Sequence, residues 1–522
     1  MPIWNFIRHS FYQDSLTLMR LTHDLEAVPG VRRVAVMMGI PANRALLQAA
    51  GLLTPTGDAA APHDLIIAVE AETSAAAETC VATAEAACMA NRLAVASTAT
   101  VVQPRTLAAA LSLFPGANLA LISVPGMYAG REALQALQAG LHVMLFSDNV
   151  SLETEVALKH LALARGLLLM GPDCGTAIIN GVPLGFANAV PRGRIGIAAA
   201  SGTGLQEVVC LLAAAGEGIS QAIGVGGRDL SDEVGGLMLQ HALTLLAADA
   251  ETAVVCVIGK PPGPTTWGQI EAQLARLGKP CVVYVAQDLP SHQAAWYAAA
   301  TLEDASRIAV ALARGTLPGA PASLADPEPF LPFVEAETRA MHPGQRFVHG
   351  IYAGGTLAQE AHRLLQASLD HVAPGVLGGG EGHRVVDLGA DRFTAGRPHP
   401  LLDGGLRRTW IRQAAQDPTT AVLLLDIVLG YGVHPDPVGD LLPALQQARA
   451  EAQAQGRYLA VVASVCGTDQ DPQGRAAQIA ALQAHGIVVM PSNAQVARLA
   501  VHIAAAQGAS GQPMHPVDSA PV

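Results

Sequence analysis

Residues 194–216, RIGIAAASGTGLQEVVCLLAAAG, contain an apolar run, a glycine-broken turn and a second apolar run with helical spacing. This order predicts a buried strand, the turn Ser201-Gly202-Thr203-Gly204, and a helix that opens at that turn. The first backbone N–H groups of a helix have no partner inside it, and the helix dipole makes that end positive. The stretch therefore predicts an α/β domain whose turn can bind phosphate or another oxyanion; the alternative is an ordinary turn between strand and helix.

The composition places the chain among compact α/β proteins of several domains. It has 522 residues, of which 51% are apolar and 14% charged, with 52 glycines for tight turns. A net charge of −12 without a basic cluster argues against nucleic acid as a partner. The seven cysteines lack metal-ligand spacing, so we expect buried thiols and no metal. The sequence shows neither a signal peptide nor an apolar run long enough to span a bilayer, which predicts a cytoplasmic protein without membrane contact.

Alternating strand and helix patterns divide the chain into four units. Continuous apolar strands between amphipathic helices indicate parallel sheets covered on both faces. The first unit is expected to be helices on one sheet, without chemistry of its own. The expected parts are a small α+β domain (1–100), a partial Rossmann unit (101–192), an α/β domain (193–313), a proline-rich linker (314–343), a second α/β domain (344–507) and a flexible tail (508–522).

Three of these units resemble parts of succinyl-CoA synthetase. The second half of the CoA-binding domain of its α subunit is similar to residues 124–180, VPGMYAGREALQALQAGLHVMLFSDNVSLETEVALKHLALARGLLLMGPDCGTAIIN. The ligase domain of that subunit is similar to RIGIAAASGTGLQEVV (194–209) and GVGGRDL (224–230), and the ligase domain of the β subunit is similar to the fourth unit. The resemblance implies a multidomain α/β protein: a Rossmann-like CoA-binding-type unit and two flavodoxin-like succinyl-CoA-ligase-type domains, preceded by a small α+β domain.

From end to end the chain resembles the FdrA family. The stretches that carry this resemblance are LTLMRLTHDLEAVPGVRRVAVMMGIPANRALL (16–47), GPDCGTAIINGVPLGFAN (171–188), IYAGGTLAQEA (351–361), GEGHRVVDLGADRFTAGRPHPLLD (380–403) and LLLDIVLGYGVHPDP (423–437). Membership implies either an acyl-CoA synthetase, by analogy with the ligase, or a subunit of oxamate carbamoyltransferase. The latter moves a carbamoyl group from oxalurate to phosphate in allantoin breakdown, and implies an oligomer with other subunits encoded alongside and a small acid as substrate.

The residues do not support a complete acyl-CoA synthetase. An NDP-forming enzyme needs a phosphohistidine, which the ligase family carries in a Gly-His-Ala-Gly context. The corresponding stretch here, 286–305, reads AQDLPSHQAAWYAAATLEDA, and the neighbours of His292 do not match. An ATP-grasp domain and the first half of the CoA-binding fold are also missing. CoA or a nucleotide is therefore expected only under this alternative; a third possibility is a non-catalytic assembly subunit.

Carbamoyl transfer needs neither a protein nucleophile nor a cofactor. Phosphate must be held by backbone donors and a cation, and the carbonyl group must be polarised. In the ligase two helix N-termini face the phosphohistidine, and the resemblance places the matching turns at 201–204 and 430–432. We therefore expect phosphate, or the phosphate group of carbamoyl phosphate, between these turns, although both could be ordinary helix caps. The expected binding residues are Ser201, Gly202, Thr203, Gly204, Gly430, Tyr431 and Gly432.

Two residues are candidates for catalysis. Arg228, in GVGGRDL, follows a strand and could bind a carboxylate or phosphate with two hydrogen bonds, or form a surface salt bridge. His434, with Asp436 beside the second glycine turn, could orient the substrate or move a proton, or could serve as a capping residue. Weaker candidates are Asp173, Cys174, Lys260 and the polar segment 383–403, which is either a site for a small dicarboxylate-like substrate or a subunit interface.

Overall fold

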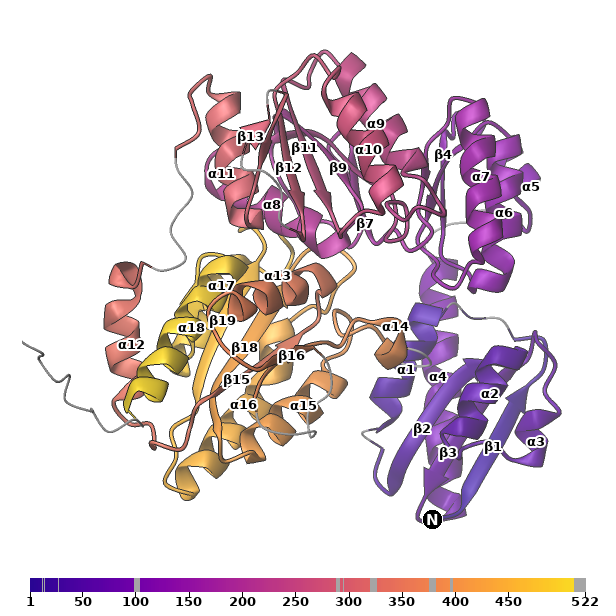
Figure 1. The fold of residues 1–522 in the computed structure, drawn as a ribbon. Helices are drawn as coiled ribbons and strands as arrows, with labels where there is room; N and C mark the ends of the chain where they lie inside the picture. The colour runs from indigo at the N-terminus through magenta and orange to yellow at the C-terminus, as the bar shows by residue number, and fades with distance from the viewer. Residues whose placement is uncertain are drawn as a thin grey trace, which may run out of the picture. The chain divides into compact units, whose positions relative to one another are not determined.

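The computed structural model describes the chain except residues 12, 14, 27, 98–103, 288–291, 294, 320–325, 375–381, 395–397 and 511–522 (Figure 1). The fold is α/β with parallel sheets, as predicted. The chain divides into two compact units, one of residues 1–117 with 391–399 and the other of residues 118–390 with 400–522. Among the described residues no helix is both long and apolar enough to cross a membrane.

The first unit is a small α+β domain on the antiparallel sheet β1-β3-β2, as the sequence predicts. Its central strand β3 is buried at every position, because helices cover both faces of the sheet. Leu25 of α1 and Cys80 of α4 pack on one face, and Leu47 of α2 packs on the other. The elements are β1 (Ile3–Arg8), α1 (Ser15–Glu26), β2 (Val31–Met38), α2 (Pro41–Ala49), α3 (Pro55–Asp58), β3 (Leu65–Ala71), α4 (Ser74–Ser97), α5 (Leu107–Leu113) and α14 (Asp391–Thr394).

The second unit begins with the three-stranded parallel sheet β4-β5-β6. Helix α6 starts at Gly126. A side chain at Gly126 would lie 2.2 Å from the carbonyl oxygen of Asp148, which explains the glycine in that first turn. Ser151 caps α7, as predicted. The elements are β4 (Leu119–Ile122), α6 (Gly126–Gln138), β5 (His142–Leu145), α7 (Leu152–Ala164) and β6 (Leu169–Met170).

The third part is an eight-stranded sheet with the order β13-β14-β12-β11-β9-β10-β7-β8. Helices α8 and α11 cover one face, and α9 and α10 cover the other (Figure 1). Helix α9 begins at Leu237, directly after Gly235 and Gly236, whose positive φ angles are not helical. The elements are β7 (Thr176–Ile179), β8 (Val182–Gly185), β9 (Arg192–Ala199), α8 (Gly202–Ala214), β10 (Ile219–Gly224), α9 (Leu237–Ala248), β11 (Val254–Gly259), α10 (Pro264–Leu274), β12 (Cys281–Val285), β13 (His292–Gln293), β14 (Trp296–Ala298) and α11 (Leu302–Ala313).

The fourth part is a six-stranded parallel sheet with the order β16-β17-β15-β18-β19-β20. Helices α13 and α18 cover one face, and α15, α16 and α17 lie on the other. Strand β18 is buried throughout, as expected for a central strand. The elements are β15 (Phe347–Tyr352), α13 (Gly355–Gln366), β16 (Val372–Pro374), β17 (His383–Asp387), α15 (Gly405–Gln416), β18 (Thr420–Val428), α16 (Pro437–Ala454), β19 (Ala460–Cys466), α17 (Arg475–Ala484), β20 (Val488–Met490) and α18 (Asn493–Ser510).

The segment 314–343, which the composition predicts to be a linker, contains a packed helix. A 3-10 turn, η1 (Glu328–Phe330), leads into α12 (Leu331–Thr338), and α12 packs against α18. Phe330 stacks on His502 of α18 with 5.4 Å between the ring centroids. The predicted tail also begins inside α18, which continues to Ser510. The low apolar content of the segment conceals this helix because few of its residues make the contact.

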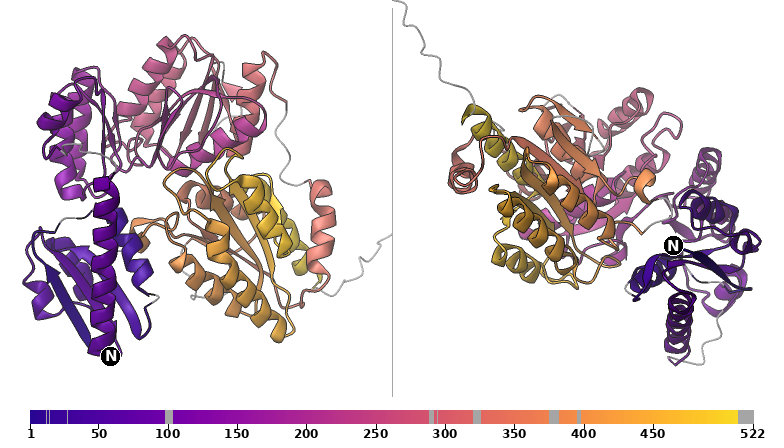
Figure 2. Two further views of the ribbon diagram at one scale, coloured as in Figure 1. Left: turned by 180° about the vertical axis from the view of Figure 1, so that it is seen from behind. Right: turned by 90° about the horizontal axis from the view of Figure 1, so that it is seen from below.

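The two ligase-type domains pack through α8 and α11 of one and α13 and α18 of the other. The left view of Figure 2 shows the two domains side by side, magenta above and orange to yellow below. A single hydrophobic core includes Leu205 and Leu212 of α8 together with Leu357 of α13 and Ala497 of α18. Because these helices share one core, their N-terminal ends are held in a defined relation.

Candidate anion site

The first turn of α8 lies at the carboxyl edge of the parallel strands, where the sequence places it. Ser201 is the N-cap, and its Oγ accepts a hydrogen bond from Gly204 N at 3.0 Å. The backbone N–H groups of Gly202 and Thr203 donate no hydrogen bond to any described residue. Two donors at the positive end of the helix dipole are therefore available to an anion.

This turn also lies where the winding direction of the sheet reverses. Strand β9 has β10 on one side and β11 on the other, so the two successive crossovers run in opposite directions. Doubly wound sheets bind ligands at the carboxyl ends of the strands at such a point. A Cβ atom on Gly202 would lie 3.3 Å from Thr176 Oγ1. One on Gly227 would lie 3.2 Å from Asp173 Oδ2 and 3.7 Å from Lys260 Nζ, so this edge carries a carboxylate as well as a cation.

The N-terminus of α13 faces the N-terminus of α8. Ser201 Oγ lies 2.6 Å from Thr356 Oγ1, and both side chains are buried. A Cβ atom on Gly354 would lie 3.0 Å from Thr203 Oγ1, so only glycine permits this approach. The resemblance to the ligase implies a second helix N-terminus opposite 201–204, and the structure has one. It belongs to α13 and lies about 75 residues before the expected glycine turn at 430–432.

A buried carboxylate binds the loop that leads into α13. Asp426 Oδ1 accepts from Ala353 N at 2.8 Å, and its Oδ2 accepts from Gly354 N at 2.7 Å. The buried Arg407 donates to Asp426 Oδ1 at 3.0 Å. In the other domain Ala200 N donates to the carbonyl oxygen of Ile258 at 2.9 Å, so no side-chain carboxylate takes the equivalent place. This difference concerns the residues that precede the two helices and not the donors of their first turns.

The glycine turn 430–432 precedes α16 but does not form its N-terminus. The helix begins at Pro437, with Asp436 as the N-cap, as predicted. Gly430 N donates to Gln473 Oε1 at 3.1 Å, and Tyr431 N donates to Ala187 O at 2.8 Å. Gly432 lies against Phe186. The segment around Phe186 and Ala187 thus lies against this turn and takes up one of its donors, while Tyr431 keeps an exposed side chain.

The two catalytic candidates have structural partners. His434 Nδ1 accepts from Asp436 N at 3.1 Å, which is the capping arrangement that the sequence left open. Arg228 Nη2 lies 2.8 Å from Glu155 Oε2 and also donates to Val150 O at 2.8 Å. Arg228 therefore takes part in an ion pair, the second of the two roles considered from the sequence.

The residue next to Arg228 belongs to a buried ionic network. Lys159 Nζ lies 2.8 Å from Glu155 Oε1 and 2.7 Å from Asp229 Oδ1, and all three side chains are shielded from solvent. Asp229 also accepts from Met238 N and Leu239 N at the start of α9. The carboxylate of Asp229 therefore links its own loop, which follows β10, to α7 and to α9. These links keep the loop at the edge of the sheet.

The weaker candidates have different outcomes. Burial raises the pKa of the Cys174 thiol to about 12, so this cysteine is an inert buried thiol, as favoured from the sequence. His383 is buried, and its Nδ1 accepts from Val348 N, while burial lowers its pKa to about 4. The polar segment 383–403 is divided, because residues 391–399 belong to the first unit and its other described residues belong to the second. The side chain of His292 lies outside the described residues.

Two acids and one amide behind the two helix ends were not predicted from the sequence. Glu207 of α8, Glu360 of α13 and Asn493 of α18 are buried and joined by hydrogen bonds. A signal was present in the sequence: Gly-Thr-x-x-Gln-Glu occurs at 202–207 and again at 355–360. This internal repeat marks the matching helices, but only their packing shows that the acids meet.

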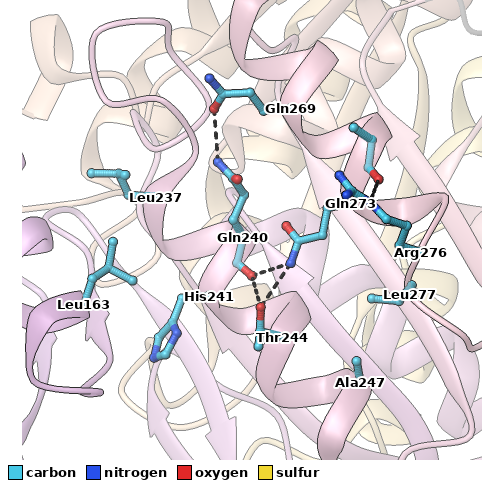
Figure 3. A pocket seen from close by; sticks show the side chains of 11 residues that line it. Leu163, Leu237, Gln240, His241, Thr244, Ala247, Gln269, Gln273, Arg276 and Leu277 are labelled. Atoms are coloured by element: carbon cyan, nitrogen blue, oxygen red, sulfur yellow. Dashed lines mark hydrogen bonds between the residues drawn. The ribbon is translucent and has the colours of Figure 1, made fainter.

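A groove of about 740 Å³ lies on another part of this domain, between α7, α9 and α10 (Figure 3). Gln273 Nε2 donates to Gln240 O and to Thr244 Oγ1, whereas Gln273 Oε1 and His241 Nε2 are buried without a hydrogen-bond partner among the described residues. None of the site residues expected from the sequence lines this groove. The geometry therefore favours the edge beside α8 over the groove as the candidate site.

The fold and the site define a protein with paired CoA-ligase-type domains and a small α+β domain at its N-terminal end. Residues 351–503 match the CoA-ligase family, and residues 1–102 match the AllF, heavy metal-associated domain. The chain belongs to the family of the Escherichia coli (strain K12) protein "Uncharacterized protein YahF". The two are 37% identical over 514 residues, which cover 96% of this chain and 98% of that protein.

Enzyme subunits are similar over shorter stretches. The α subunit of the ADP-forming succinate–CoA ligase of Aquifex aeolicus is 30% identical over 177 residues, which cover 33% of this chain and 57% of that subunit. Among solved structures, the dinucleotide-forming acetyl-coenzyme A synthetase 1 of Ca. Korarchaeum cryptofilum aligns over 75% of this chain and 84% of its own, at 16% identity and a TM-score of 0.29.

The described residues of the N-terminal domain do not fit a heavy-metal site. They contain no group of three His, Cys, Asp or Glu side chains arranged to hold an ion. Cys80 and Cys88 are buried in α4, and burial raises the pKa of Cys80 to about 11, which disfavours the thiolate that a metal needs.

Proposed function

We propose that this chain is an FdrA-type subunit of an oxamate carbamoyltransferase. The AllF match of residues 1–102 supports a place in the allantoin pathway, and the observation that carries the chemistry is the open first turn of α8. In the proposed reaction a phosphate oxygen attacks the carbamoyl carbon of oxalurate. The bond from that carbon to the amide nitrogen breaks, and the nitrogen takes a proton, which gives carbamoyl phosphate and oxamate.

Phosphate would be held by the backbone N–H groups of Gly202 and Thr203, with Lys260 as the nearby cation. Backbone donors at a helix N-terminus suit a phosphate group because they are fixed before it binds and are reinforced by the dipole. Residues of the partner subunits would complete the pocket for oxalurate.

An acyl-CoA synthetase is the second candidate, and the CoA-ligase match over residues 351–503 favours it. The first test is therefore the thermal stabilisation of the purified chain by carbamoyl phosphate, phosphate, CoA and ATP, each alone. A ligand that binds only the folded state raises the melting temperature. We expect shifts with phosphate and carbamoyl phosphate; a shift with CoA or ATP alone would favour the synthetase instead.

The matched variants are Gly202→Asp and Gly202→Ala. An acidic residue in the first turn of a helix is well tolerated in general, but here its charge would lie in the proposed phosphate position. The alanine variant adds a similar Cβ atom without the charge. We expect Gly202→Asp to abolish the phosphate-induced shift and Gly202→Ala to retain most of it. Equal shifts in the two variants would refute phosphate binding at this turn.

A further inference from the structure

The helices α8 and α13 begin with the same pattern of residues. Gly-Thr-x-x-Gln-Glu covers the first six residues of each helix, so Glu207 and Glu360 occupy equivalent positions. Each glutamate lies five residues, about 7.5 Å along the axis, behind the first helical residue. The repeat therefore places two acids directly behind the two facing helix ends.

Each of these acids caps a helix that belongs to the other domain. Glu207 of α8 accepts from Asn493 N, the first residue of α18, at 3.0 Å. Glu360 of α13 accepts from Leu302 N, the first residue of α11, at 2.7 Å. The contacts are reciprocal. Each ligase-type domain supplies a carboxyl group that accepts a hydrogen bond from the first backbone N–H group of the other domain's last helix.

Asn493 links the two acids. Its backbone N–H bonds Glu207, while its Nδ2 donates to Glu360 Oε2 at 2.7 Å and to Leu357 O at 3.0 Å. All three of these polar side chains are buried, with at most 3% exposure. One amide residue thus connects α8, α13 and α18 in a region where water does not compete for the hydrogen bonds.

We propose that Glu207, Glu360 and Asn493 are positioning residues that set the spacing of α8 and α13, and with it the geometry of the anion site at Gly202 and Thr203. This inference rests on the proposed function for the identity of the ligand. The contact between Ser201 and Thr356 lies at the end of the two helices, and the three positioning residues lie behind it. A change of pairing among them would tilt one helix against the other and move the donors.

The test exchanges the partners of one hydrogen bond. At pH 8, above the pKa of about 7 of Glu360, Glu360→Gln offers one oxygen to two donors, Leu302 N and Asn493 Nδ2. Asn493→Asp sets two carboxylates against each other, so each single variant loses a hydrogen bond. The double variant restores the bond between positions 360 and 493, because the glutamine amide can donate to the new carboxylate, but it does not restore the bond to Leu357 O. Glu335→Gln, at an exposed acid of α12, is the control.

Phosphate affinity is measured by calorimetry on variants whose circular dichroism and melting confirm folding. We expect phosphate to bind about tenfold more weakly in each single variant, because small displacements of the fixed donors weaken their hydrogen bonds to the phosphate. The double variant should recover part of the affinity, and Glu335→Gln should stay near the wild type. Wild-type affinity in both single variants, or no recovery in the double variant, would overturn the positioning role.

A second measurement separates this inference from the proposed function. Amide hydrogen exchange of peptides covering 200–206 and 353–359 reports on the helix ends without any ligand. We expect faster exchange in both peptides for the single variants and a return toward wild type in the double variant. If the wild type binds no phosphate, the proposed function fails, whereas unchanged exchange in the single variants refutes the positioning residues alone.

Discussion

At the scale of the residue, single buried polar groups decide how the chain before a helix is held. Asp426 fixes the loop before α13, since its carboxylate accepts from two backbone donors and pairs with Arg407. The matching position beside α8 is Ile258, which offers only its carbonyl oxygen. The two related domains therefore differ by one side chain in the way the chain enters these helices.

Removal of Asp426 alone should be costly. In Asp426→Leu the buried guanidinium of Arg407 loses its counter-charge, and we expect the free energy of unfolding to fall by about 3–5 kcal/mol. The double variant Asp426→Leu/Arg407→Met should lose less, because no unpaired charge remains. Urea denaturation monitored by circular dichroism measures both values. A double variant less stable than the single one would contradict this account of the ion pair.

Glu360 should make stability depend on pH. Burial raises the pKa of Glu360 to about 7, with a further contribution from the charge of Glu207, while Arg363 opposes the shift. The residues Tyr284 and Tyr352 also face it. Because the folded state holds the proton more tightly than the unfolded state, this residue's contribution to stability declines as pH rises from about 4.5 to about 7.

Denaturant titrations between pH 5 and pH 8 measure this effect. We expect Glu360→Gln, which cannot ionise, to lose less stability than the wild type over that range. Asp417→Asn, at a half-buried carboxylate of the same domain, serves as a control for the general effect of removing an acid. Parallel profiles for the wild type and Glu360→Gln would show that Glu360 does not retain its proton in the folded state.

At the scale of the element, the helices meet where glycine allows it. A Cβ atom on Gly204 would lie 2.6 Å from Ser201 Oγ and 3.0 Å from a methyl carbon of Thr356. The approach of α8 to α13 therefore depends on the absence of a side chain there. By contrast Gly268, within the exposed surface of α10, has open space around it.

The same substitution at these two glycines should have opposite effects. Gly204→Ala forces the two helices apart, and we expect it to lower the free energy of unfolding by about 1–3 kcal/mol. Gly268→Ala should raise it by up to about 1 kcal/mol, because alanine favours the helix and restricts the unfolded chain. Thermal or urea unfolding of the two variants provides the comparison. Similar changes of stability in both would argue against close packing at Gly204.

At the scale of the whole molecule, buried contacts join elements that are far apart in the sequence. Within the second unit, Lys159 of α7 reaches Asp229 in the loop after β10, 70 residues further along the chain. This contact ties the sheet β4-β5-β6 to the neighbouring ligase-type domain. The same loop carries Gly227, beside Lys260, so the buried network supports the edge where the anion site lies.

Lys159→Met should destabilise the second unit. It leaves Glu155 and Asp229 buried with one fewer cation, and we expect a loss of about 3–5 kcal/mol in the free energy of unfolding. Lys260→Met, at an exposed lysine of the same unit, should change stability by no more than about 0.5 kcal/mol. Denaturant unfolding of the two variants tests this contrast. A small effect of Lys159→Met would mean that solvent reaches the network in solution.

The sequence by itself predicts the local elements of this protein well, because strands, turns and caps leave short-range patterns. The caps Ser151 and Asp436, the strand Val31–Met38 and the turn 201–204 are where their residue types place them. The hairpin β7–β8, whose strands have four residues each, and the eight-residue helix α12 went undetected, since elements this short show too few periods of their pattern.

The tertiary structure alone decided which of these elements meet. The sequence paired 201–204 with 430–432, but packing brings Gly354 and Thr356 of α13 to Thr203 and Ser201 instead. Packing also places Arg228 in an ion pair with Glu155, and it leaves His434 as the acceptor of a hydrogen bond from Asp436 N. The physical reason is that hydrogen bonds and ion pairs of buried side chains depend on the distance between elements in space. Local sequence patterns specify each helix and its cap, but they do not specify the helix that will face it.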